Sequence, residues 1–432
     1  MYLASPPVAI SHYRRGLALL ADRPHTPERD RLEIHLYLAL GAPFLSANGW
    51  GGTERGEAIW RALELLQAAE GIDDHRPVAE WDALLLALYT QADWLLSQGE
   101  LEQAAQLGER MLALTSEPAR LPQVLAHRIL GMSRLFQGNF PEARRQLEET
   151  LAIYAAIGEP ATFRWIGNDL QAGCRAVFGF VLAISGYLDQ AWVEISQALK
   201  RARRIRHTSA LGTTLIFACE VAILRGDSAA LQALADELLH VGQTKGLRFF
   251  LAYGWAAKGY AQATQTQPGS EQAASSLELI RRGMQLWEST GTYTGYGMWI
   301  VRLADACLQA GDSAAGLAIT TEALTAPIRP GIAIGLSQLQ RVHGELLLLQ
   351  EFPDRSAAEA SFERALAIAR EQEAHTLELH AAISLAKLWR TEKPDAARRL
   401  LTETCAWFTE GWETHDLQEA QALLQNNGRP QA

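Results

Sequence analysis

Cysteine is scarce in this 432-residue chain, and its placement argues against metal binding. The four cysteines, at positions 174, 219, 307 and 405, form no Cys-x-x-Cys pair and have no nearby histidine that would complete a zinc-ligand set. We therefore expect buried free thiols in a reducing compartment. The sequence predicts neither a metal site nor a bound cofactor.

Long apolar runs and an excess of positive charge are also missing. The longest apolar stretch, 176–184, is far too short to span a membrane, and the N-terminus has no basic segment followed by an apolar core. Lys and Arg number 39 against 49 Asp and Glu, which gives a net charge of −10 and disfavours a nucleic-acid partner. These features predict a cytoplasmic protein without nucleic-acid or membrane partners.

Motifs that carry catalysis are absent from the sequence. There is no G-x-x-x-x-G-K-[ST] loop, and its nearest imitation, 48–53, lacks the lysine and a preceding strand, so a turn between helices is favoured over a phosphate site. His375 and His380 are five residues apart, about 140° around a helix, so solvated side chains are favoured over a metal pair. We predict that the chain is not an enzyme.

Helix-forming residues, by contrast, are abundant. Ala, Leu, Glu, Gln and Arg dominate, only 16 residues are proline, and no run alternates apolar and polar residues with a period of two. One unit recurs: an apolar-periodic stretch ends at a turn residue, and an alanine follows about five positions later. We expect this alanine to lie where the two helices of a pair cross, because close approach leaves room for little more than a Cβ. The expected crossing positions are Ala104, Ala143, Ala191, Ala230, Ala274, Ala315, Ala358 and Ala397.

Most of these alanines are about 39 to 44 residues apart, so each unit holds two helices and must stack on its neighbours. The sequence therefore predicts an all-α fold, a right-handed α-α superhelix or solenoid of about nine to ten helix pairs. About eight extra residues at 158–169 interrupt the spacing, and we expect a specialised part of the groove there. The expected pairs are 28–70, 78–115, 119–157, 165–205, 208–245, 247–290, 293–326, 330–371 and 374–410.

The two ends do not fit this paired pattern. Residues 6–22 resemble the second helix of a pair without a first helix, and 415–425 has the place of a C-terminal capping helix. We expect one solenoid domain over 1–432, with the paired repeats at 28–410. The half-repeat start favours a chain cut from a longer protein, or one that docks on something upstream.

Several segments carry a family resemblance. With the alanine and aromatic positions placed, the units are similar to tetratricopeptide repeats of about 40 residues. Segments 13–41, 360–390 and 407–424 resemble the C-terminal repeat region of bacterial proteins that carry a class III nucleotidyl cyclase and a P-loop signalling ATPase upstream. Segment 163–191 resembles the same region, although Asp169-Leu170 stands where the family usually has Asp-Pro. The resemblance implies an interaction module, with the cyclase and ATPase N-terminal to Met1.

In such superhelices the first helices of the pairs line the concave surface. Polar and aromatic side chains on those helices, off the apolar stripe, are the candidates for partner binding. We expect the arginines to be better candidates for partner binding than the tryptophans, several of which will pack in the core. The candidates are Arg164, Trp165, Asn168, Arg175, Tyr253, Trp255, Lys258, Tyr296, Trp299, Arg302, Gln338, Arg341 and Glu345.

The sequence thus predicts a bacterial signalling module that binds a peptide or partner protein in its concave groove and regulates an upstream ATPase or cyclase. An alternative stays open: a pocket near 160–175 that binds a small metabolite. The basic run 200–206 has two interpretations of its own. It can stabilise the negative end of a helix dipole, or it can form a patch for an acidic ligand.

Overall fold

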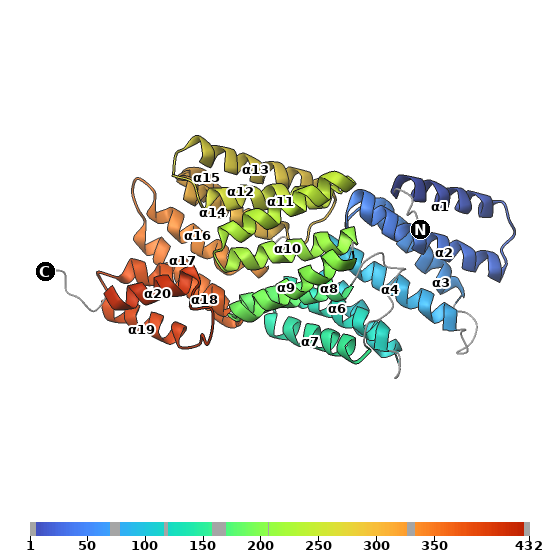
Figure 1. Cartoon of the computed structure of the whole chain (residues 1–432), viewed down its shortest axis with the longest axis horizontal. Helices are drawn as coiled ribbons and strands as arrows, with labels where there is room; N and C mark the ends of the chain where they lie inside the picture. Colours follow the sequence, from blue (N-terminus) through green and yellow to red (C-terminus); the bar gives the residue numbers. More distant parts are fainter. Residues whose placement is uncertain are drawn as a thin grey trace.

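Helices joined by turns and loops make up the described structure, which is a computed structural model (Figure 1). It describes residues 6–69, 78–115, 120–157, 170–205, 207–325 and 333–426, and these ranges contain no strand. The all-α solenoid predicted from the repeats is confirmed. The insertion at 158–169, where part of the groove was expected, lies outside the described residues.

The described helices form nine pairs between a single first helix and a single last helix. The first half of the chain contains α1 (Pro6–Ala21), α2 (Pro27–Asn48), α3 (Thr53–Ala69), α4 (Val78–Gln98), α5 (Leu101–Leu114), α6 (Arg120–Phe136), α7 (Phe140–Ile157), α8 (Leu170–Ile184), α9 (Leu188–Ile205) and α10 (Thr208–Leu224). The second half contains α11 (Ser228–Lys245), α12 (Arg248–Ala263), α13 (Glu271–Glu288), α14 (Tyr296–Ala310), α15 (Ser313–Thr325), η1 (Ala333–Gly335), α16 (Leu336–Leu348), α17 (Arg355–Glu371), α18 (His375–Trp389), α19 (Pro394–Cys405) and α20 (His415–Asn426).

Local sequence signals set the turns within the pairs. Gly138 and Gly186 follow the first helices of their pairs with φ of 79° and 92°, a backbone conformation that glycine adopts without strain. Asp227 and Asp354 begin the next helices, because their side chains accept hydrogen bonds from backbone N–H groups three residues later. Helix ends are thus encoded within a few residues of each turn.

In every described pair except the one with α13, the fourth residue of the second helix is buried at the crossing. Ala104, Ala143, Ala191, Ala358 and Ala397 occupy this position and have no exposed surface, as predicted. The other three predicted positions are wrong. In α11 and α15 the alanine lies one residue early, so the buried fourth residues are Leu231 and Gly316 in place of Ala230 and Ala315. In α13, which follows a longer turn, Ala274 is exposed and Ala273 is buried.

Distant turns of the superhelix contact one another at several places, and two of these contacts carry hydrogen bonds between segments about 190 to 240 residues apart. We call the first contact the front clasp: the turn 49–52 and the end of α4 pack against the loop 290–294. Gly51 N donates to Thr292 Oγ1 at 3.2 Å, and Tyr293 N donates to Ser97 O at 2.8 Å. The glycine-rich turn expected to be ordinary therefore joins helix pairs about 240 residues apart in sequence.

We call the second contact the rear clasp, in which the turn between α8 and α9 packs against α18 and the segment 407–411. Thr376 Oγ1 donates to Ala183 O at 2.5 Å, and the Tyr187 and Trp407 rings meet edge to face at 5.1 Å. Glu410 accepts from two backbone N–H groups at the start of α9, each at 3.0 Å. In Figure 1, α18 lies beside the green helices of the middle of the chain.

The histidines expected to be solvated are not. His375 stacks on Trp407 with ring centroids 3.8 Å apart, and His380 bridges Gln338 at 2.5 Å and Asp416 at 2.8 Å. They do not converge on a common ligand, but both hold helices together. The four cysteines are buried free thiols, as expected. Within the described ranges, no helix is both long and apolar enough to cross a membrane.

Candidate binding site

The first helices of successive pairs surround a cavity of about 120 Å³ on the inner side of the superhelix. Since a water needs roughly 10–15 Å³ of such space, the cavity has room for about ten waters or an organic group of similar size. We call it the aromatic cavity. Its lining residues come from α4, α6, α8, α10, α12 and α14, together with Trp50, Trp287 and the front clasp loop.

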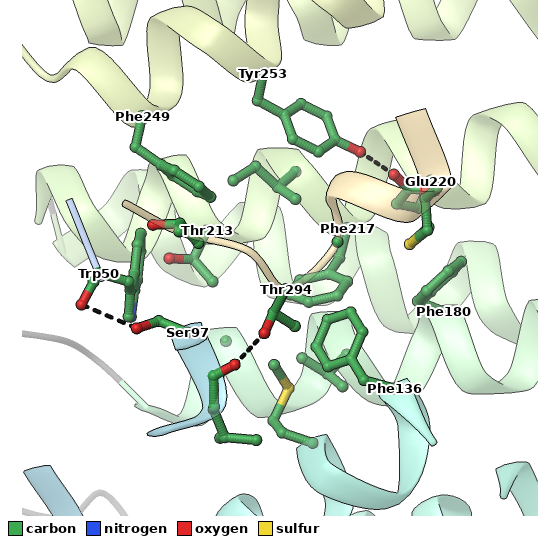
Figure 2. Close-up of a pocket in the computed structure, with 18 of the residues that line it drawn as sticks. Trp50, Ser97, Phe136, Phe180, Thr213, Phe217, Glu220, Phe249, Tyr253 and Thr294 are labelled. Carbon is green, nitrogen blue, oxygen red and sulfur yellow. Dashed lines mark hydrogen bonds between the residues drawn. The ribbon is translucent and has the colours of Figure 1, made fainter. Parts of the chain in front are cut away.

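The wall is mostly apolar and contains eight aromatic side chains. Figure 2 shows Trp50, Phe249 and Thr213 toward one end of the cavity and Glu220 and Phe180 toward the other. The remaining aromatic lining residues are Phe136, Phe217, Tyr253, Trp287 and Trp299. Pockets of this kind, apolar with a few convergent polar groups, are typical ligand sites.

One charged cluster joins the wall at α4 and α6. Asp93 lies between two arginines: Arg55 Nη2 donates to Oδ2 at 2.8 Å and Arg128 Nη1 donates to Oδ1 at 3.1 Å. Arg128 Nη1 also donates to the Tyr89 hydroxyl at 2.9 Å. Burial raises the pKa of Asp93, but the two guanidiniums outweigh it and hold that pKa below its usual value. Asp93 is therefore ionised at neutral pH.

A second cluster spans α10, α12 and α14. Glu220 accepts hydrogen bonds from the Tyr253 hydroxyl and from Arg302 Nη2. Burial raises the pKa of Glu220 above its usual value, and Arg302 and Tyr253 only partly oppose this. Nε of Arg302 and Oγ1 of Thr213 are buried without a hydrogen-bond partner. Unpaired polar groups inside a protein are costly, so these two atoms are positions that a ligand could satisfy.

A smaller cavity of about 80 Å³ adjoins the first, with Phe180 and Met298 lining both. We call it the polar cavity, because Tyr260, Arg302, Asp305, Gln338 and Arg341 line it. Arg341 donates to Asp305 at 3.2 Å and to Gln338 at 2.6 Å. Glu220 faces the aromatic cavity and its partner Arg302 the polar one, so this ion pair separates the two spaces.

Five of the sequence candidates line the cavities. Tyr253 and Trp299 face the aromatic cavity, whereas Arg302, Gln338 and Arg341 face the polar cavity. A sixth candidate, Glu345, lies behind Arg341 and accepts from it at 2.7 Å.

Four other candidates contact a neighbouring helix. Arg175 pairs with Glu194 at 2.7 Å, and Lys258 pairs with Asp236 at 2.7 Å. Trp255 packs under Arg282, and the Tyr296 hydroxyl donates to Glu288 at 2.6 Å. These contacts join first helices to second helices of the solenoid. The last three candidates, Arg164, Trp165 and Asn168, lie outside the described residues.

Sequence reasoning missed Asp93, Arg128 and Glu220, which carry the charges of the aromatic cavity. A signal was present, because Glu220 interrupts the apolar run 215–224 and Asp93 lies directly before the apolar residues 94–96. Charged residues are rarely buried unless they are paired. The basic run 200–206 contributes Arg203, which pairs with Glu237 on α11 at 2.6 Å.

A surface group with metal-ligand geometry lies on α20. His415, Asp416 and Glu419 place their ligand atoms within 4.8 Å of one another. His415 is exposed, and exposed acidic groups of this kind are common without an ion.

Comparisons with known proteins add information on the fold. No family model matches this chain, and no curated protein matches it as a relative. Among solved structures, it is similar to a Rap protein complexed with Competence and Sporulation Factor, with 10% identity, a TM-score of 0.52, and coverage of 93% of this chain and 98% of that chain. A circular tandem repeat protein covers 97% of this chain and 88% of its own at 13% identity, but its TM-score of 0.15 carries no argument.

The likeness to the Rap protein supports the helical-repeat fold and the resemblance to tetratricopeptide repeats. The comparison with the Rap protein does not support the upstream cyclase and ATPase that the sequence resemblance implied.

Proposed function

We propose that this chain is a non-catalytic recognition module that binds a short peptide segment in the aromatic cavity. The observation that carries the proposal is the aromatic wall, formed by six successive first helices and bounded by the front clasp. A ligand there contacts helices from most of the superhelix at once. Its presence can therefore bias the curvature of the solenoid, which is how a repeat module signals to a partner.

The spacing of polar groups fits a peptide. Thr213 and Glu220 are seven residues apart on α10, which corresponds to roughly 10 Å along the helix axis. An extended chain of about three residues covers that distance. The aromatic rings between the two ends would receive apolar side chains, and the polar groups at the ends would receive backbone atoms. The Rap protein of similar fold was solved in complex with a factor, which is compatible with a solenoid of this kind holding a ligand.

Gly173 provides a direct test. It lies inside α8 and lines the cavity, and a Cβ built on it meets no atom within 4 Å. Gly173→Leu should therefore fill the cavity without breaking the fold. The assay is retention of a pool of apolar tripeptides by the protein, measured by mass spectrometry. The parent should retain members of the pool and Gly173→Leu should not.

The matched control is Gly41→Ala, which changes another helical glycine with no atom within 4 Å of its Cβ and outside the cavity lining. This variant should retain the same peptides as the parent. Equal retention by Gly173→Leu and the parent would place the binding site elsewhere.

A small metabolite is the second candidate ligand. Leu170 and Gly173 favour it, because they lie within the pocket proposed near 160–175 and also line the aromatic cavity. A metabolite should raise the melting temperature of the parent by mass action with no protein partner present, and should leave Gly173→Leu unchanged.

The proposal also includes a partner protein and a regulated enzyme. We propose a single solenoid domain over the whole chain that regulates an ATPase or cyclase, with the sequence candidates outside the cavities as surface for a partner protein. Pulldown from a bacterial lysate with the parent and with an Arg175→Ala, Lys258→Ala variant tests that surface. Unchanged recovery of every partner would count against it.

A further inference from the structure

The charges of the Asp93 cluster, at one side of the aromatic cavity, do not balance. Arg55 and Arg128 share one carboxylate, that of Asp93, and their side chains are only 4% and 10% exposed. Among the described lining residues the other charged group is Glu220, which is already paired with Arg302. Among the described residues, the Asp93 cluster therefore holds two guanidiniums and one carboxylate, with Arg128 in the cavity wall and Arg55 behind it.

This excess charge lies in an unfavourable place. Buried charges are normally paired, because an apolar wall cannot replace their hydration. The lining of the cavity is mostly apolar, and behind it Arg55 Nε is buried without a hydrogen-bond partner. The cavity is thus set up to accept one negative charge attached to an apolar body.

The size of the excess charge indicates which anionic group the ligand carries. A carboxylate carries one negative charge, which matches the single excess positive charge, whereas a phosphate monoester carries about −1.5 to −2 at neutral pH. A guanidinium also forms strong charge-assisted hydrogen bonds with a carboxylate. Arg128 is the arginine of the cluster that lines the cavity, and it shares the Asp93 carboxylate with Arg55.

We propose that the ligand of the aromatic cavity is an apolar monocarboxylate whose charge is received by Arg128. The inference rests on the proposed function, because it concerns the same cavity. The carboxylate can be the C-terminus of a short peptide or the head of a free apolar acid, and the test separates these two sources.

The experiment compares four probes on the full chain. Two are matched pools of apolar tripeptides, one with free C-terminal carboxylates and one with C-terminal amides. The other two are decanoate and decanamide. Retention of each probe is measured for the parent, Arg128→Gln, Arg128→Lys and the surface control Arg145→Gln, whose arginine pairs with Glu142 at an exposed site.

The structure predicts that the parent retains the acid pool roughly tenfold or more over the amide pool, the difference expected for one hydrogen bond to a charged group. Arg128→Gln should remove this preference, whereas Arg128→Lys should keep part of it and Arg145→Gln all of it. Removing Arg128 leaves Arg55 and Asp93 paired one to one, so Arg128→Gln should stay folded. If Arg128→Gln does not fold, the comparison of acids with amides on the parent still decides whether the ligand is a carboxylate.

The outcomes separate this inference from the proposed function. Equal retention of acid and amide peptides by the parent would overturn the carboxylate and leave the peptide cavity standing. Retention of decanoate over decanamide, with neither peptide pool retained, would support the carboxylate and overturn the peptide. Retention of no probe would overturn both. A tenfold preference that survives in Arg128→Gln would overturn the assignment to Arg128.

Discussion

Glu220 and Arg302 form a buried ion pair whose side chains are only 4% and 10% exposed. Breaking such a pair from one side leaves an uncompensated charge in the interior. We therefore expect Arg302→Met to lower the free energy of unfolding by about 3–5 kcal/mol. The double variant Glu220→Gln, Arg302→Met should recover most of this loss, because both charges are then gone. Urea unfolding followed by circular dichroism measures both changes.

The control is the exposed pair of Arg145 with Glu142, where the arginine side chain is 59% exposed. Exposed pairs contribute about 0–1 kcal/mol, so Arg145→Met should change little. If Arg302→Met unfolded at the same urea concentration as the parent, the pair would not be buried as the structure has it.

Asp416 gives a pH dependence at the C-terminal helix. Burial raises its pKa, but the contacts with His380 at 2.8 Å and His415 at 3.3 Å outweigh that and hold the pKa far below its usual range. A carboxyl whose folded pKa lies below its unfolded value contributes stability above about pH 4, and this stability is lost as the pH falls. The parent should therefore be more stable than Asp416→Asn at pH 7, and the difference should shrink below about pH 4. Urea unfolding at pH 7, 5 and 3 tests this, and a difference that stays constant would contradict it.

At the level of elements, the front clasp depends on Gly51. A Cβ at this position would lie 1.9 Å from the Gly291 carbonyl oxygen, so even alanine forces the two segments apart. We expect Gly51→Ala to accelerate amide exchange at Tyr293 and Thr294, whose N–H groups donate to Ser97 O at 2.8 and 3.3 Å. Gly41→Ala, with no atom near its Cβ, should leave that exchange unchanged. Equal exchange in both variants would mean that the clasp is not closed in solution.

The helix pairs could be predicted from the sequence because their signals are local. The 3.6-residue apolar period, the glycine turns and the caps all lie within one pair. The crossing residue was misplaced in α11 and α15 because it is set by where the second helix starts. In α13 that start follows a longer turn, and Ala273 is buried in place of Ala274.

The candidate site was less predictable because its contacts are distant. Arg302 could be recognised as a charged residue on a first helix, but its partner Glu220 lies 82 residues away on another pair. The clasps depend on the pitch of the whole superhelix, which no single repeat encodes. The Gly51 turn therefore looked ordinary in the sequence, although it meets Thr292 across 241 residues.

For the whole molecule, the two clasps link turns of the superhelix that are far apart in the sequence. Solenoids without such links change curvature readily, because each repeat contacts only its neighbours. Here the front clasp supplies part of the wall of the aromatic cavity, since Thr292 and Thr294 line it. Opening of the front clasp would therefore remove part of the cavity wall and expose the cavity.

Trp407 tests whether the rear clasp fixes the shape of the molecule. Its ring contacts Tyr187 at 5.1 Å and stacks on His375 at 3.8 Å, and aromatic pairs contribute about 0.5–1.5 kcal/mol each. Trp407→Ala should release α18 and α19 from the turn between α8 and α9 and increase the radius of gyration measured by small-angle X-ray scattering. Trp60→Ala, which removes a ring that is 56% exposed on α3, should leave it unchanged. An unchanged radius in Trp407→Ala would show that the Trp407 ring contacts of the rear clasp do not set the curvature.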